Sequence, residues 1–186
     1  MSDTLRFPAT ERLPMNTLDV ACKEWAVVCQ ALAEGRQSVL LRKGGIAEAG
    51  GQFRPQHEAF LLYPTYFHEQ RAGIIPEWHE RLAAVEAERP PAGIIRLTHW
   101  VRVLRVEYVQ NLAAALALRP QHIWTDEVVR QRFHYREPGL FVLHVETYPL
   151  PQAVERLERP EYAGCKSWVH LDQPVPLAAA PLEPSS

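Results

Sequence analysis

Apolar residues along the chain recur with two periods, one typical of helices and one typical of strands. The first stripe, with alternating spacings of four and three, consists of Leu18, Cys22, Trp25, Cys29 and Leu32. This spacing predicts an amphipathic helix over 17–34, because such residues share one helical face. Asn16 or Thr17 can cap its start, and Gly35 can end it.

The remaining segments predict a sheet with further helices. Runs rich in β-branched and aromatic residues predict strands at 37–43, 59–64, 94–109, 139–150 and 167–171. In the longest strand the alternation breaks at Arg105, which indicates a bulge. Helical spacing or capping predicts helices at 77–88, at 111–118 and from Thr125 onward. Since strands and helices do not alternate regularly, we expect an α+β fold with a mainly antiparallel or mixed sheet, the N-terminal helix and two central helices.

The length and composition suit one globular domain. The chain has 186 residues, 47% of them hydrophobic and 23% charged, which is enough to build one ordinary core. We expect a flexible leader at 1–15, a single domain at 16–172 and a disordered tail, rich in Pro and Ala, at 173–186.

The charge and cysteine content indicate the environment of the protein. The net charge of −2 gives no global attraction to nucleic acid or to anionic membranes. Three cysteines without a Cys-x-x-Cys motif provide no disulfide framework. The first fifteen residues contain no continuous apolar core of the length that a signal peptide needs, and no later run approaches about 18 apolar residues. We therefore expect a cytoplasmic protein with no membrane association.

The dipeptide His-Glu occurs three times, with the histidines at His57, His68 and His79. Imidazole and carboxylate groups can bind metals or transfer protons, so the catalytic candidates are His57, Glu58, His68 and Glu69. However, the predicted strand 59–64 separates the first two pairs by about 20 Å unless the chain folds back. A metal ion needs ligands within about 2.2 Å, so we assign no metal site.

A second candidate site follows from the pairing of two strands. If 37–43 and 59–64 form a hairpin, Arg42 and Lys43 lie near His57 and Glu58. Fixed cations beside Gly44 and Gly45, whose amides can turn toward a ligand, suit a phosphate or a carboxylate. Tyr63 lies toward the opposite end of the second strand.

Arginines are concentrated between residues 93 and 136. The seven are Arg96, Arg102, Arg105, Arg119, Arg130, Arg132 and Arg136, against three acidic residues, a local balance of +4. Aromatic residues lie between them in the sequence, a combination typical of phosphate contact with base stacking. The alternative is that the arginines reflect a general preference for arginine over lysine, since arginine outnumbers lysine 17 to 3 throughout the sequence. The aromatic residues would then belong to the core.

The sequence lacks the motifs of several common enzyme and binding-site classes. The sequence contains no Walker loop, no Gly-x-Gly-x-x-Gly, no Gly-x-Ser-x-Gly and no zinc-ribbon spacing. It identifies no cofactor. None of the three lysines has an acidic residue two positions before it. A metal-dependent nuclease built on an acidic-x-Lys motif in a strand would therefore need a degenerate form of that motif.

Four blocks carry a resemblance to a known family. They are KEWAVVCQAL, SVLLRKGGI, HEAFLLYPTYFHEQ and HIWTDEVVRQRF. In this order they resemble the bacterial family called domain of unknown function 1802. The resemblance implies no activity or cofactor, but it implies that Lys23-Glu24-Trp25, Arg42 to Gly45, Tyr63 to His68 and Trp124-Thr125 belong to the family pattern.

Three functions remain open. The leading hypothesis is a module that binds an anionic ligand, above all nucleic acid or another phosphate-bearing molecule, through Arg42, Lys43, Gly44, Gly45, His57, Tyr63, Arg96 and Arg102. The second is a divalent-metal nuclease or phosphodiesterase that uses the His-Glu pairs. The third is a protein-interaction scaffold, which requires Leu18 and Trp25 to be exposed.

Overall fold

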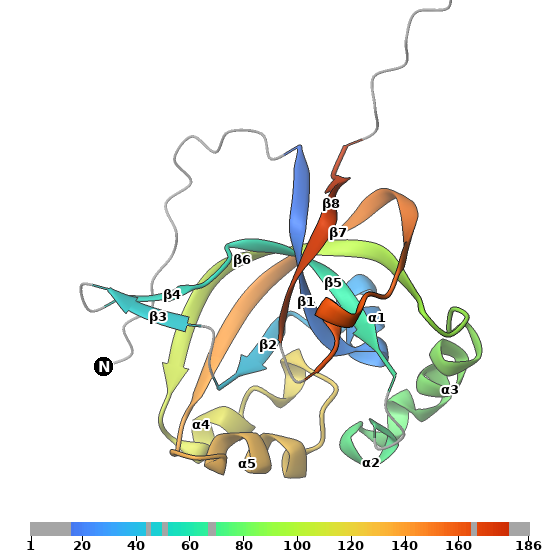
Figure 1. Ribbon diagram of the computed structural model, residues 1–186. Helices are drawn as coiled ribbons and strands as arrows, with labels where there is room; N and C mark the ends of the chain where they lie inside the picture. The colour runs from blue at the N-terminus through green and yellow to red at the C-terminus, as the bar shows by residue number, and fades with distance from the viewer. Residues whose placement is uncertain (1–15, 44–45, 50–51, 67–69, 165–166, 179–186) are drawn as a thin grey trace, which may run out of the picture.

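A computed structural model describes residues 16–43, 46–49, 52–66, 70–164 and 167–178. Its main sheet has six strands in the order β2-β7-β6-β5-β1-β8 (Figure 1). Their bounds are β1 Thr17–Trp25, β2 Val39–Arg42, β5 Ala59–Thr65, β6 Ile94–Val109, β7 Leu140–Leu157 and β8 Trp168–Pro176. A separate antiparallel pair is formed by β3 Ile46–Ala49 and β4 Gln52–Pro55. In the main sheet β1 and β5 are parallel and all other neighbours are antiparallel, so the predicted mixed-sheet α+β class is confirmed.

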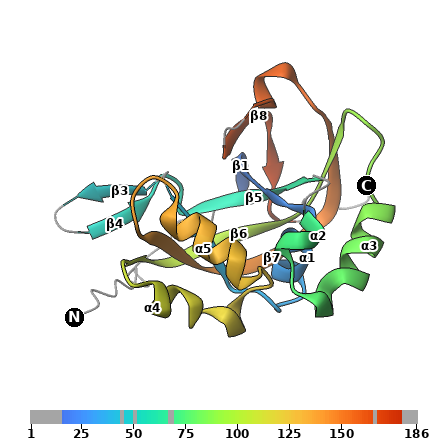
Figure 2. The same cartoon turned by 90° about the horizontal axis from the view of Figure 1, so that it is seen from below.

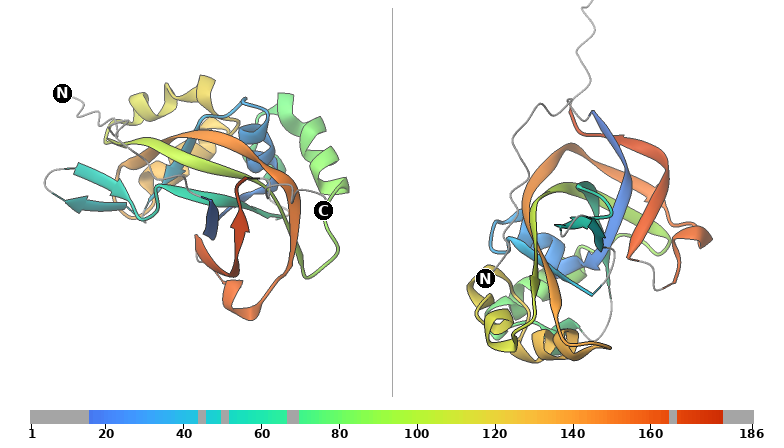
Figure 3. Two further views of the ribbon diagram at one scale, coloured as in Figure 1. Left: turned by 90° about the horizontal axis from the view of Figure 1, so that it is seen from above. Right: turned by 90° about the vertical axis from the view of Figure 1, so that its left-hand side faces the viewer.

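Helices cover one face of this sheet (Figure 2). The α-helices are α1 Ala26–Ala33, α2 Gln70–Gly73, α3 His79–Ala87, α4 Leu112–Leu116 and α5 Asp126–His134, and the 3-10 helices are η1 Pro76–Trp78, η2 Arg119–Gln121 and η3 Pro160–Tyr162. Buried apolar side chains of α1, α3, α4 and α5 form one core with the strands. Burial of such side chains contributes about 1.5–3 kcal/mol each. On the other face, β8 and η3 close a second core over the curved sheet (Figure 3).

The predicted central helices and long strand are confirmed. The Oγ1 atom of Thr125 caps α5 by accepting a hydrogen bond from the Val128 N–H group at 3.4 Å. The register between β6 and β7 shifts between Val103 and Arg105, where the break in alternation predicts a bulge. β7 continues to Leu157, seven residues beyond the predicted end, and pairs with the start of β6.

The predicted N-terminal helix is correct only in its second half. Residues 17–25 form strand β1, and α1 begins at Ala26. The apolar residues of β1 are buried on both faces of the sheet, Val20 and Cys22 in one core and Leu18 and Ala21 in the other. Such a run does not distinguish a helix from a strand. Leu18 is only 8% exposed and Trp25 is half-buried, so the exposed apolar stripe that the scaffold hypothesis requires does not exist.

The predicted hairpin of 37–43 with 59–64 is wrong. β2 pairs with β7, and β5 pairs with β1 and β6. The intervening segment contains the β3-β4 pair instead. The parallel pairing of β1 with β5 joins distant segments and brings the C-terminal ends of both strands to the same edge.

The disordered tail predicted at 173–186 starts too early in the sequence. Residues 173–176 belong to β8, where Val175 is fully buried opposite Leu18. The predicted leader 1–15 and the residues 179–186 lie outside the described residues. Among the described residues, every helix is too short or too polar to span a bilayer.

Candidate functional site

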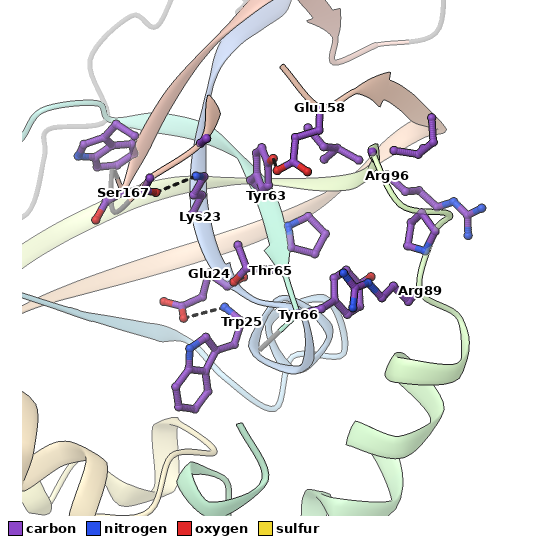
Figure 4. Close-up of a pocket in the computed structure, with 18 of the residues that line it drawn as sticks. Lys23, Glu24, Trp25, Tyr63, Thr65, Tyr66, Arg89, Arg96, Glu158 and Ser167 are labelled. Carbon is purple, nitrogen blue, oxygen red and sulfur yellow. Dashed lines mark hydrogen bonds between the residues drawn. The ribbon is translucent and has the colours of Figure 1, made fainter. Parts of the chain in front are cut away.

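A large cavity opens where β1 and β5 end together. In the parallel register Lys23 lies opposite Tyr63, and Trp25 lies opposite Thr65. The cavity has a volume of about 1120 Å³, slightly above the usual range for small-molecule sites. Figure 4 shows these side chains together on the two strand ends. The charged residues that line the cavity are Lys23, Glu24, Arg42, Lys43, Arg89, Arg96, Arg132 and Glu158.

A buried carboxylate lies at the inner wall. Glu24 is only 5% exposed, and its Oε1 atom accepts a hydrogen bond from the Trp25 N–H group at 2.9 Å. The Nη2 atom of Arg42 is 3.9 Å from Oε2 of Glu24 and also donates to the Cys22 thiol. The side chain of Arg42 is 13% exposed, and its Nε has no partner among the described residues. One donor of this largely buried guanidinium is therefore unused.

Arg132 adds a second guanidinium to this wall. Its Cζ lies 4.4 Å from the centre of the Trp124 ring and 5.6 Å from that of the Trp25 ring. Its Nη1 atom donates to the Leu41 carbonyl at 3.4 Å. Burial lowers the pKa of Arg132, and Glu24 partly offsets this effect. The pKa of an arginine lies far above neutral pH, so both guanidiniums of this wall remain charged.

The Trp25 ring can pack closely against position 73 because that residue is a glycine. A Cβ atom added to Gly73 would lie 2.6 Å and 2.8 Å from two carbons of the Trp25 ring. Real Cβ atoms do not approach so closely, so any other residue would displace the ring. Gly73 therefore helps to hold the aromatic surface on which Arg132 stacks.

Lys43 stabilises one wall of the cavity through hydrogen bonds. Its ammonium donates to the carbonyls of Phe133 at 3.3 Å, Gly139 at 2.7 Å and Glu137. These three bonds occupy all three donors of the ammonium group. Lys43 thus holds the turn after α5, where Tyr135 lines the cavity.

Lys23 and Tyr63 form the opposite wall. Lys23 donates to the carbonyls of Tyr162 and Gly164, the latter at 3.2 Å, and lies over the Tyr63 ring. The Tyr63 hydroxyl donates to Glu158 at 2.9 Å. Burial and this bond to a carboxylate both raise the pKa of Tyr63, so the hydroxyl remains protonated at neutral pH.

The outer rim combines arginine with an aromatic ring. Arg89 is exposed, and its Cζ lies 5.1 Å from the centre of the Tyr66 ring. Arg96, also in the lining, is paired with Glu155 through two hydrogen bonds of 2.9 Å and 2.8 Å. Arg89 is therefore the more accessible of these two cations.

The structure brings only some of the predicted ligand residues together. Arg42, Lys43, Tyr63 and Arg96 line the cavity. Arg102 lies instead against the stacked pair of Trp100 and Tyr148 on the sheet. Gly44 and Gly45 lie outside the described residues.

The two described His-Glu candidates, His57 and Glu58, are not in the lining of the cavity. The His57 ring packs edge-on against Trp168 at 4.9 Å and near His170 at 5.7 Å. Glu58 is exposed, and the predicted partners His68 and Glu69 lie outside the described residues. In the described ranges no three His, Cys, Asp or Glu side chains are grouped to hold a metal ion.

Three of the seven arginines of the predicted surface have an acidic partner. Arg96 faces Glu155, Arg105 faces Glu107, and Arg119 faces Asp126. Arg132 lies in the cavity wall, separate from these pairs. Proximity in sequence therefore overestimates the unpaired positive charge of this segment.

The inner wall contains residues that were not among the predicted site residues. Glu24 and Trp25 fell within the expected helix, and Arg132 was one of seven arginines. One signal was available for the first two. A glutamate inside the apolar run from Val20 to Cys29 is unusual, because buried charges need partners.

Comparison with known proteins gives the fold and a family. No curated protein matches. The crystal structure of ASCH from Zymomonas mobilis is similar, with a TM-score of 0.51 at 10% identity over 83% of this chain and 87% of that chain. A serine-to-alanine mutant of ZmASCH, also from Zymomonas mobilis, gives a TM-score of 0.43 at 10% identity over 77% and 89%. The first likeness supports the α+β architecture alone. A family model matches residues 21–185, and the chain therefore belongs to the family described as domain of unknown function (DUF1802).

Proposed function

We propose that the cavity binds an anionic ligand, and that an unpaired stretch of nucleic acid is the class it suits best. The observation that carries this proposal is the charge of the inner wall. Arg42 lies 3.9 Å from the buried Glu24 carboxylate, and Arg132, in the same cavity lining, has no acidic partner within 4 Å among the described residues. A buried surplus charge is costly, and a bound anion would offset it.

Nucleic acid is favoured over a simple anion by the aromatic lining. Trp25, Tyr66, Tyr135 and Trp168 line the same cavity as the guanidiniums. Aromatic side chains stack on bases, while arginines contact phosphates. A duplex keeps its bases stacked inside and would have to be opened to present one to a cavity, so single strands are the expected ligand.

The metal-dependent enzyme hypothesis has less support in this geometry. Its candidate His57 packs against Trp168 and His170, and Glu58 is exposed. The location predicted for the binding module is the cytoplasm, where nucleic acid is accessible.

Fluorescence anisotropy of labelled oligonucleotides tests the proposal. Single-stranded and duplex RNA and DNA are titrated with protein at about 50 and 200 mM salt, since phosphate contacts weaken with salt. Single strands are expected to bind more tightly than duplex, and Arg89→Ala is expected to weaken binding. The matched control is Arg81→Ala, an exposed arginine that pairs with Glu34 and is not in the cavity lining. No binding at the lower salt, or equal losses in both variants, would contradict the proposal.

A further inference from the structure

The cavity contains an accessible hydrogen-bond acceptor as well as its cations. Glu158 directly follows the last residue of β7, lines the cavity and is exposed. The ion pairs formed among the described residues do not include it. A carboxylate only accepts hydrogen bonds, so a ligand group that meets Glu158 must donate them.

Glu158 is held in place from two sides. Its N–H group donates to the Gly93 carbonyl at 2.7 Å. Its Oε1 atom accepts from the hydroxyl of Tyr63, a residue that is only 3% exposed, and Figure 4 shows the two side chains next to each other. Oε1 can accept a second hydrogen bond, and Oε2 has no partner in the described part of the chain. The carboxylate is therefore oriented by the protein and can still accept from two donors of a ligand.

The carboxylate and the guanidinium of Arg132 are attached to neighbouring positions of the same cavity wall. Tyr63, which binds Glu158, is paired with Lys23 in the register of β1 and β5. Trp25, two residues further along β1, has its ring centre 5.6 Å from Cζ of Arg132. Side chains two residues apart point to the same face of a strand, and their positions are about 7 Å apart. One nucleotide can therefore place its phosphate beside Arg132 and the edge of its base beside Glu158.

Guanine presents the donors that such a carboxylate needs. Its N1–H and N2–H groups are adjacent and parallel, so they can bind both oxygens of one carboxylate, as the two donors of an arginine fork do. Adenine and cytosine present one amino group beside a ring nitrogen that accepts, and uracil and thymine present one N–H group between two carbonyls. In these four bases an acceptor would face the carboxylate, and two acceptors repel each other.

We infer that the cavity prefers guanine among the bases of a single strand, and that Glu158 recognises its N1–H and N2–H groups. This inference rests on the proposed function and adds the base that the site selects. Tyr63 is a positioning residue, because its hydroxyl orients the carboxylate. Bases without two adjacent donors are discriminated against, since the carboxylate would lose water without gaining a full set of partners.

Anisotropy titrations with matched oligonucleotides test the inference. Labelled oligouridylates with a single central guanosine, inosine, adenosine, cytidine or uridine are titrated with the full chain at about 50 mM salt. The guanosine oligonucleotide should bind about tenfold more tightly than the uridine one. Inosine keeps the N1–H group and lacks the N2 amino group, so its oligonucleotide should bind more weakly than the guanosine one. Equal affinity for all of them, or a preference for another base, would overturn the inference while the proposed function stands.

The variant Glu158→Gln tests whether this side chain carries the preference. Glutamine can still accept from the Tyr63 hydroxyl, but its amide has one oxygen and cannot match two parallel donors. The ratio of guanosine to uridine affinity should fall to near one. The matched control Glu161→Gln removes the same charge from an exposed residue outside the cavity lining and should keep the wild-type ratio. A ratio retained in Glu158→Gln would overturn the inference. If no single strand binds the wild-type protein, the proposed function and the inference both fail.

Discussion

Two groups of arginines in this protein differ in what surrounds them. Those along β6 and before α5, Arg96, Arg105 and Arg119, each have their own acidic partner and are partly exposed. In the cavity wall, Arg42 lies 3.9 Å from the buried Glu24 carboxylate, and Arg132 has no acidic partner within 4 Å among the described residues. The first group makes the sequence look basic, but the second holds the charge without a matching partner.

The difference teaches that unpaired charge, rather than the number of charges, identifies an anion site. An exposed ion pair contributes about 0–1 kcal/mol and attracts ligands weakly. A buried cation without its own counter-ion is unfavourable until an anion binds. Substitutions in the two groups should therefore have very different effects.

The largest effect is expected for Arg42→Ala. Removing this guanidinium takes away the ion-pair partner of the buried Glu24 carboxylate at 3.9 Å, so the free energy of unfolding should fall by about 3–5 kcal/mol. Urea denaturation measures this change. The double variant Arg42→Ala, Glu24→Gln should recover a large part of the loss, and a double variant no more stable than the single one would argue against the buried pair.

The next effect concerns the pH dependence of stability near this wall. His122 is fully buried, and burial together with Arg119 and Arg132 lowers its pKa to about 4. The unfolded chain, with a pKa of about 6.5, binds a proton in this range that the folded chain does not. Stability should therefore be lost as the pH falls from about 6.5 to 4, by up to about 3 kcal/mol. The same pH slope in His122→Leu as in wild type would refute this assignment.

Gly73→Ala tests whether the aromatic surface under Arg132 depends on close packing. The added Cβ would meet the Trp25 ring at 2.6 Å, so stability should fall by about 1–3 kcal/mol. Oligonucleotide binding should weaken as the ring moves. Ala72→Ser, at the exposed neighbouring position, is the control and should change neither quantity.

A moderate effect on binding alone is expected for Arg89→Ala. The Arg89 guanidinium lies over the Tyr66 ring at the rim of the cavity, and the side chain is exposed. Its loss should therefore leave the fold intact. Loss of one phosphate contact should reduce the slope of log affinity against log salt by about 0.7 for a single strand. An unchanged slope would place the phosphate contacts elsewhere.

The smallest effect is expected for Arg105→Ala in the paired group. Arg105 is engaged by Glu107 at 3.0 Å, so stability should change by no more than about 1 kcal/mol. The affinity for oligonucleotides should be unchanged within the error of anisotropy titrations. A loss as large as that of Arg89→Ala would remove the distinction between the two groups.

Local patterns in the sequence were sufficient for much of the fold. The alternation in 94–109 and the cap at Thr125 predict β6 and α5, because both signals depend on neighbouring residues alone. The strand β1 was missed, because Leu18, Cys22 and Trp25 also satisfy helical spacing. A central strand buried on both faces has no polar face that would show a period of two.

The site was less predictable, because it depends on pairing between distant segments. Arg42 and Tyr63 are both predicted as ligand residues and do line one cavity, but not through a hairpin. Tyr63 is placed there by the parallel pairing of β1 with β5, and Arg42 lies on β2, which pairs with β7. Arg132 comes from α5, and no local pattern relates it to Glu24. Its role becomes visible only once both side chains are placed in three dimensions.

The most direct test of the central claim is a crystal structure of the protein with a bound thymidine dinucleotide. The account predicts the phosphodiester inside the cavity beside Arg132, with at least one base against an aromatic side chain of the cavity. A phosphate bound instead along the paired arginines of β6, with the cavity empty of ligand, would contradict it.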